Sequence, residues 1–173
     1  MIDKFKKRRG QMIVEAMIAI SVATVGLFGV MALLSRSISL NRVIANHYVA
    51  NNLAAEGIEI VKYKIDSNYL SERVWNDELG PGSYGVEIRE NNERPYEFSP
   101  ISDCGGVNEM YFGEENGLYG YSTVGKPTTF RRCVTIEDIG DGIGLSVSSK
   151  VSWKDIAGSD FEVVVEDQFY NWR

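Results

Sequence analysis

The sequence predicts an α+β fold in which one long N-terminal helix packs on a small antiparallel β-sheet. Residues 11–65 contain no proline, and their apolar side chains are either continuous or recur at helical spacing. After residue 66, apolar and polar residues alternate between glycine-rich turns, as is typical of half-buried strands. We therefore expect four parts: a basic leader (1–10), an apolar half of the helix (11–34), an amphipathic half (35–66) and a C-terminal β domain (67–173).

The leader and the apolar half predict a single membrane span. Ala16 to Leu34 is uncharged, and a helix of this length reaches about 28 Å, close to the thickness of the hydrocarbon core. The positive-inside rule predicts a cytoplasmic N-terminus and an extracytoplasmic C-terminal domain. The basic residues that support this orientation are Lys4, Lys6, Lys7, Arg8 and Arg9.

Two other interpretations of this segment stay open. A secretory signal peptide has an apolar region of about 7–15 residues followed by a small-x-small cleavage site, and residues 31–35 offer no good site of that kind. An uncleaved signal anchor explains the length and the basic flank, but not Gly10 and Glu15 at their spacing. Glu15 lies at the edge of the predicted membrane helix, where an acid is costly, and an acid at the helix centre costs about 2.5–3.5 kcal/mol on insertion scales, so its presence calls for a function.

This arrangement resembles the N-terminus of type IV prepilins and of the related pseudopilins. In that family a short basic leader ends in Gly, a Glu is the fifth mature residue, and a long apolar helix follows. The resemblance implies cleavage between Gly10 and Gln11 by a prepilin peptidase, methylation of the new N-terminus, and docking of Glu15 against the positive N-terminus of an adjacent subunit. The first mature residue is usually Phe or Met, so Gln11 departs from the pattern, and its cyclisation to pyroglutamate is an alternative to methylation.

The resemblance implies a minor pilin or pseudopilin, closest to the pilus-modification or I-type kind through residues 54–59 and the strand-rich end. Its expected partners are other pilins or pseudopilins, the prepilin peptidase and an inner-membrane assembly platform. The expected location is the cytoplasmic membrane before assembly and a cell-surface or periplasmic filament afterwards. The alternative is a single-pass anchored binding or adhesion protein that does not polymerise.

The amphipathic half predicts one stripe that faces a partner surface, with the helix ending at about residues 66–68. The stripe consists of Leu40, Ile44, Tyr48, Ala55, Ile58, Val61 and Ile65. Beyond it, alternation predicts strands near 84–88, 130–136, 145–153 and 161–169, the last two joined as an antiparallel hairpin. The stretch between the first two strands, the Tyr-rich loop (91–127), is predicted to be irregular. It is expected either to fold back on the sheet or to contact another protein.

The remaining residues give few indications of chemistry. The formal net charge of −6 rises in magnitude once the leader is removed, so direct nucleic-acid binding is not expected. Cys104 and Cys133 predict a disulfide in an exported domain, with two free thiols as the alternative. No catalytic motif is present, His47 is the only histidine, and no enzyme activity or cofactor is expected. Glu137, Asp138 and Asp141 are the candidate ligands for calcium, together with carbonyl oxygens of the glycine-rich turn beside them.

Overall fold

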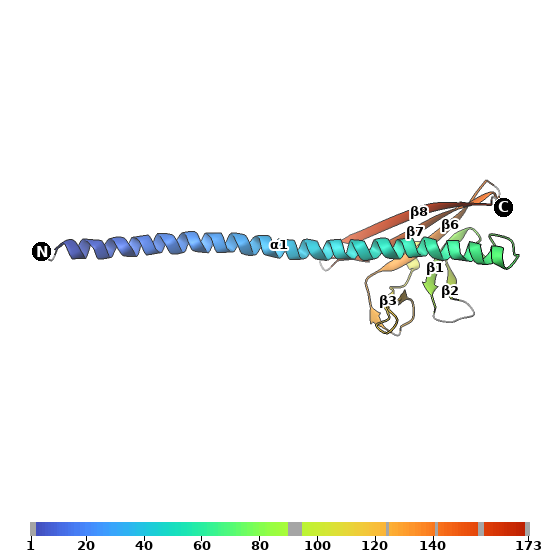
Figure 1. Ribbon diagram of the computed structural model, residues 1–173, viewed down its shortest axis with the longest axis horizontal. Helices are drawn as coiled ribbons and strands as arrows, with labels where there is room; N and C mark the ends of the chain where they lie inside the picture. The colour runs from blue at the N-terminus through green and yellow to red at the C-terminus, as the bar shows by residue number, and fades with distance from the viewer. Residues whose placement is uncertain (1–2, 90–94, 124, 141, 156–157, 172–173) are drawn as a thin grey trace. The chain divides into compact units, whose positions relative to one another are not determined.

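The computed structural model describes residues 3–89, 95–123, 125–140, 142–155 and 158–171, with side chains from residue 11 onward (Figure 1). It confirms the α+β class, because one long helix is followed by an antiparallel sheet. The chain divides into two compact units, 1–45 and 46–173. We describe each unit by itself.

Helix α1 spans Asp3–Leu70 and therefore ends slightly later than predicted. The amide of Arg73 bonds to the carbonyl of Asn68 at 2.9 Å, and Glu72 adopts a left-handed φ of 55°, a common way to close a helix C-terminus. The buried Asn68 side chain donates to the carbonyls of Trp75 (3.2 Å) and Asp77 (2.9 Å). The side-chain amide of Asn68 is thus hydrogen-bonded to the segment that folds back after the helix.

The main sheet has five antiparallel strands in the order β2-β1-β6-β7-β8. The four predicted strands are confirmed and are slightly longer than expected. The predicted hairpin is also confirmed, since Lys154 pairs with Asp160 at the turn between the last two strands. The strand bounds are β1 Gly82–Ile88, β2 Tyr96–Ile101, β6 Arg131–Ile139, β7 Gly144–Lys154 and β8 Asp160–Tyr170.

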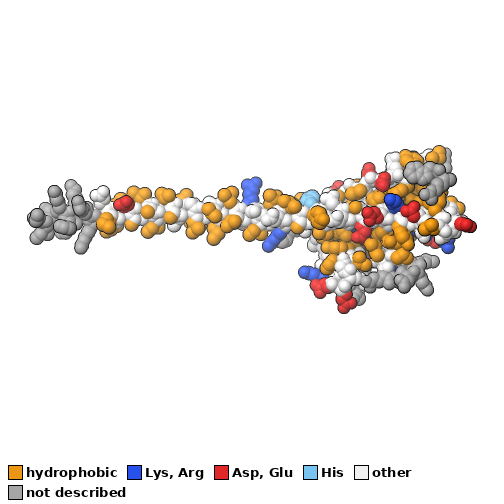
Figure 2. Space-filling view, viewed as in Figure 1, with side chains coloured by type: hydrophobic (Ala, Val, Ile, Leu, Met, Phe, Trp, Pro, Cys, Tyr) orange, Lys and Arg blue, Asp and Glu red, His pale blue; other side chains and the backbone are white. Residues whose placement is uncertain are grey.

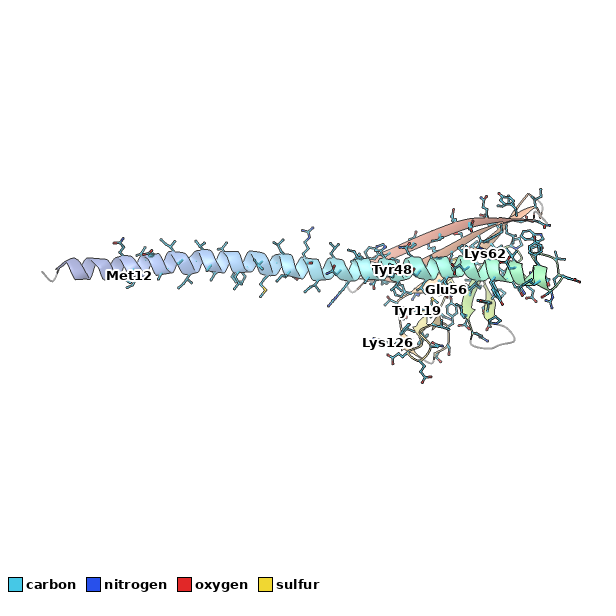
Figure 3. All side chains as sticks on the ribbon, viewed as in Figure 1. Met12, Tyr48, Glu56, Lys62, Tyr119 and Lys126 are labelled. Atoms are coloured by element: carbon cyan, nitrogen blue, oxygen red, sulfur yellow. A yellow bond between two sulfur atoms is a disulfide. The ribbon has the colours of Figure 1, made fainter. Side chains whose placement is uncertain are left out.

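The prediction that the Tyr-rich loop is irregular was wrong for much of its described length. It supplies edge strand β2, and it folds into a second, three-stranded sheet in the order β4-β3-β5. Tyr119 and Lys126, which belong to this second sheet, are labelled in Figure 3. Proline interrupts the alternation in β2, and strands of two residues are too short to show a period. Residues 91–94 and 124 lie outside the described residues. The elements of this segment are η1 Cys104–Gly106, β3 Tyr111–Phe112, β4 Tyr119–Gly120 and β5 Lys126–Pro127.

The helix face that contacts the sheet was predicted correctly only at its C-terminal end. Ile58, Val61 and Ile65 are buried as expected. The other members of the predicted stripe, Leu40, Ile44, Tyr48 and Ala55, are exposed. Small residues take their place in the core, because they allow a closer approach of helix to sheet than large side chains permit; they are Ala50, Ala54 and Gly57.

Gly57 marks the tightest contact between helix and sheet. A Cβ atom at this position would lie 2.3 Å from Oγ of Ser149 on β7 and 3.1 Å from a methyl of Val134 on β6. Real Cβ atoms do not approach other atoms so closely, so the backbone spacing depends on the absence of a side chain. The Ser149 hydroxyl is buried and has no hydrogen-bond partner among the described residues.

Candidate functional site

The hydrophobic side chains of the apolar half of α1 are exposed in the single chain. Its large apolar residues are 54–76% exposed, with Phe28 the most exposed, and Figure 2 shows them gathered along the face in view. Among the described residues this is the one helix long and apolar enough to cross a membrane, by length and composition. Such a surface is stable only against lipid or other apolar helices.

The two hydroxyl groups near the centre of this segment bond back to the helix itself. The Ser21 hydroxyl donates to the carbonyl of Met17 at 2.8 Å, and the Thr24 hydroxyl donates to the carbonyl of Ser21 at 2.9 Å. Their hydrogen-bonding capacity is therefore met without water, as an apolar medium requires. A methyl group at Gly26 or Gly29 would meet no atom of the described residues within 4 Å, which leaves room for another helix to approach.

Glu15 is the exception on this surface. It is exposed, and it has no hydrogen-bond or ion-pair partner among the described residues. Its neighbours on the helix surface are Gln11, Val14, Ile18 and Ala19, which surround it with mostly apolar groups. A carboxylate in such surroundings would need a cation from outside the described part of the chain once water is removed.

The predicted cleavage site lies at the margin of the described structure. The backbone of Gly10 and Gln11 belongs to α1, but the side chains of residues 3–10 and all of residues 1–2 lie outside the described residues.

In the second unit, a buried arginine joins the helix to the sheet. Arg132 on β6 is fully buried, and its Nη1 atom donates to the carbonyl of Leu53 (3.1 Å) and to Oε1 of Glu56 (2.8 Å). Its Nη2 atom donates to the carbonyl of Val86 on β1 at 2.6 Å. One side chain thus connects three elements through an ion pair and two carbonyl bonds.

Arg132 lies where the main sheet separates. Strands β1 and β6 pair only from Gly82 to Tyr84, and beyond that point the Val86 carbonyl bonds to the Arg132 side chain in place of a strand neighbour. The carbonyl of Arg132 in turn accepts from the hydroxyl of Tyr121, which follows β4, at 2.8 Å. The gap between β1 and β6 is therefore filled by one arginine and one tyrosine.

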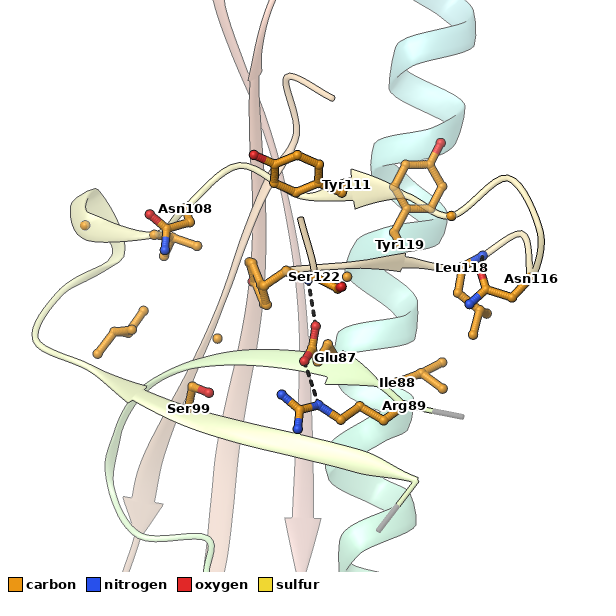
Figure 4. Close-up of a pocket in the computed structure, with 17 residues that line it drawn as sticks. Glu87, Ile88, Arg89, Ser99, Asn108, Tyr111, Asn116, Leu118, Tyr119 and Ser122 are labelled. Atoms are coloured by element: carbon orange, nitrogen blue, oxygen red, sulfur yellow. Dashed lines mark hydrogen bonds and ion pairs between the residues drawn. The ribbon is translucent and has the colours of Figure 1, made fainter. Parts of the chain in front are cut away.

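A pocket of about 610 Å³ lies between strands β1 and β2 and the small sheet (Figure 4). Of the residues that line it, Glu87 and Arg89 are the two charged ones. Glu87 is almost fully buried; its Oε2 accepts from the amide of Tyr121 (2.6 Å) and its Oε1 from Nε of Arg89 (2.8 Å). The hydrogen bond to Glu87 is the largest cause of the raised pKa of Arg89.

Aromatic and amide side chains form the upper wall of this pocket. Figure 4 shows Tyr111 and Tyr119 on the small sheet, with Asn108 and Asn116 on the connections beside it. Burial raises the pKa of Tyr119 and of Tyr121. The Asn116 side chain accepts from the amide of Leu118 at 3.1 Å, which holds the turn between β3 and β4.

A disulfide joins Cys104 in η1 to Cys133 on β6, with their Cα atoms 5.5 Å apart. Asp103 accepts from the amides of Gly105 (2.6 Å) and Gly106 (3.0 Å) and so fixes the short helix that follows it. Since Gly106 and Val107 line the pocket, the disulfide attaches that wall covalently to the main sheet.

The calcium candidates form a turn rather than an evident ion site. Asp138 accepts from the amide of Gly142 at 2.9 Å, and Glu137 is exposed at the end of β6. Asp141 lies outside the described residues. No group of three or more potential metal ligands occurs among the residues that are described.

Sequence reasoning missed Arg132, Glu87 and the pocket, although the sequence carries a signal for the first. Arg132 occupies an inward position in the alternation of β6, between Phe130 and Val134, and a charge at such a position indicates a buried partner. The partner, Glu56, is 76 residues away along the chain and is not marked by any local pattern. Comparisons with family models, with curated proteins and with solved structures found no match.

Proposed function

We propose that the chain is a minor pilin or pseudopilin, a structural subunit of a type IV pilus-like or type II secretion-like filament. In this proposal a prepilin peptidase cleaves after Gly10. The mature helix then remains in the membrane until assembly, with its C-terminal domain on the extracytoplasmic side. An assembly platform then transfers the subunit into a bundle of apolar helices.

One observation carries the proposal: Glu15 is the single charged residue between Gln11 and Ser35, on a helix whose other side chains there are mostly apolar and exposed. A lone carboxylate is costly both in lipid and in a helix bundle unless it meets a cation. The amine created by cleavage before Gln11 is such a cation when it belongs to a neighbouring subunit. The pair would stabilise one register and disfavour the others, since a shift leaves both charges unpaired.

The position of Glu15 provides a direct test. Glu15→Gln keeps the size of the side chain and removes its charge, so the variant is expected to be inserted and cleaved but lost from sheared filaments. Thr24→Ala, which changes a hydroxyl already bonded within the helix, is the matched control and is expected to assemble normally. Incorporation of Glu15→Gln at the wild-type level would refute docking through this residue.

Processing is tested separately from docking. Gly10→Val is expected to block cleavage and to leave a protein that retains the leader, measured as intact mass. N-terminal sequencing of the membrane-extracted wild type is expected to start at Gln11. A start at Met1 would support an uncleaved anchor, and a start beyond Leu34 would support ordinary secretion.

A second candidate is an anchored extracellular binding protein that does not polymerise. The pocket between the two sheets favours it, because a pure spacer domain does not need a concave site lined with aromatic groups. Normal filament incorporation would exclude this candidate, whereas cleavage without any self-association would favour it.

A further inference from the structure

We propose that the pocket between strands β1 and β2 and the small sheet binds a neutral mono- or disaccharide. This inference goes beyond the proposed function and does not depend on whether the chain polymerises. The pocket belongs entirely to the second unit, and its lining comes from described residues.

The size and construction of the pocket suit a small ligand. Its volume of about 610 Å³ lies within the range of about 300–1,000 Å³ typical of small-molecule sites. Its walls are fixed before any ligand binds: the disulfide Cys104–Cys133 holds one side, and the carboxylate of Glu87 bonds to the amide of Tyr121 on the other. Because the site is ordered before the ligand binds, little of the binding free energy is lost in ordering it.

The charges on the wall cancel, which argues against an ionic ligand. Glu87 and Arg89 are in contact at 2.8 Å, and Arg89 also reaches Glu97 on β2. No lysine lines the pocket, and the nearly buried Glu87 carboxylate already has a partner for each oxygen. An anion would meet no free cation on these walls, and a cation would have to displace Arg89.

The remaining polar groups suit hydroxyls. The side chains of Asn108 and Tyr111 have no hydrogen-bond partner among the described residues, and each can both donate and accept. A sugar hydroxyl has the same double capacity. The pocket therefore offers hydrogen bonds to a polyhydroxylated ligand, whereas a purely apolar ligand would leave these side chains without a hydrogen-bond partner.

The apolar groups of the pocket suit the C–H faces of a sugar ring. Tyr111 lies on one wall, on the same face of the small sheet as Gly120, and Leu118 also lines the pocket (Figure 4). Tyr119 projects from the opposite face of that sheet and packs on Phe112 and Phe130. Sugar rings carry C–H groups on their faces, and such groups pack on aromatic surfaces while the hydroxyls point outward.

The test is a binding titration of the full-length chain in a detergent without a sugar headgroup. The probes are glucose, galactose, mannose, N-acetylglucosamine and their common disaccharides, with glucuronic acid as a charged probe of similar size. At least one neutral probe is expected to bind saturably with a dissociation constant of about 0.1–10 mM by saturation-transfer NMR, as a few hydrogen bonds and one stacked face allow.

Two variants locate the binding without threatening the fold, since the groups they remove make no hydrogen bond within the described structure. Asn108→Ala and Tyr111→Phe are each expected to weaken the binding about two- to ten-fold. Tyr48→Ala removes a tyrosine that is exposed on α1 and is expected to leave the affinity unchanged. The proposal is overturned by the absence of saturable binding for every neutral probe, by binding of glucuronic acid alone, or by binding that neither pocket variant alters.

Discussion

The two ends of helix α1 both carry apolar side chains, but these side chains have different surroundings. In the apolar half (11–34), isoleucine, valine and phenylalanine side chains are more than half exposed within the chain. In the sheet-facing half (46–70), Ile60 and Val61 are buried against the strands, and small residues hold the closest contacts. The difference teaches that apolar composition alone does not identify a protein core. One half is completed by the chain itself, and the other needs a surface that the chain does not supply.

The largest contrast is expected from one substitution made in both halves. Ile60→Ala removes a side chain that is 2% exposed in the core, and it should lower the free energy of unfolding by about 4 kcal/mol. Ile18→Ala changes a residue that is 61% exposed, and it should leave that free energy unchanged while weakening membrane association. Denaturant unfolding in detergent and membrane extraction measure the two effects. Equal losses of stability would show that the apolar half belongs to the folded core.

The ion pair between helix and sheet is expected to give the next largest effect. Glu56→Ala leaves the buried guanidinium of Arg132 without its carboxylate, and it should cost about 3 kcal/mol of unfolding free energy. Arg132→Met replaces the charge with an apolar side chain, and it should cost less than the loss of Glu56 alone.

Glu59→Ala is the control for this pair, since Glu59 is exposed on the same helix and should change stability by less than about 0.5 kcal/mol. If Glu56→Ala and Glu59→Ala have the same effect, the bridge does not stabilise the contact between α1 and the sheet.

Glycine distinguishes the two halves in a third way. Gly57→Ala should cost about 2 kcal/mol, because the new methyl would meet Ser149 and Val134. Gly26→Ala meets no atom of the described residues and should leave the second unit's stability unchanged. Thermal unfolding of both variants measures this contrast. A clash with Ser149 predicts partial rescue of Gly57→Ala by Ser149→Gly, and no rescue would place the strain elsewhere.

The smallest expected effect is a loss of stability at alkaline pH that is confined to the second unit. Burial raises the pKa of Tyr121 above its ordinary value of 10.0, so the folded state keeps the phenolic proton to higher pH than the unfolded state. The corresponding stabilisation is complete below about pH 10 and is lost as the pH rises through the folded pKa.

Tyr121→Phe should make the unfolding free energy less dependent on pH in this range, at a cost of about 1 kcal/mol for the lost bond to the Arg132 carbonyl. Residues 11–45 contain no tyrosine and should contribute nothing to the effect. If the pH dependence of the unfolding free energy is the same in Tyr121→Phe as in the wild type, other groups cause the loss of stability at alkaline pH.

Patterns of local origin were predicted well, and contacts between distant residues were not. The strands β6, β7 and β8 are nine or eleven residues long, so enough of their alternation shows in the sequence to predict them. The small sheet was missed because its strands have only two residues each. The helix face that contacts the sheet was predicted from large residues such as Leu40 and Tyr48, which are exposed. The close contact with the sheet is made instead by small residues such as Ala50 and Gly57, which a search for large apolar side chains does not find.

The sequence by itself determined the α+β class, the apolar segment with its lone Glu15, and the positions of the long strands. Each of these depends on periodicity or charge within a short window, which local physical chemistry reads directly. Only the tertiary structure decided that the helix approaches the sheet through Gly57, that Arg132 bonds to Glu56 and Val86, and that a pocket opens beside Glu87. These features arise where residues far apart in the chain meet, and no local pattern encodes which of them will be neighbours.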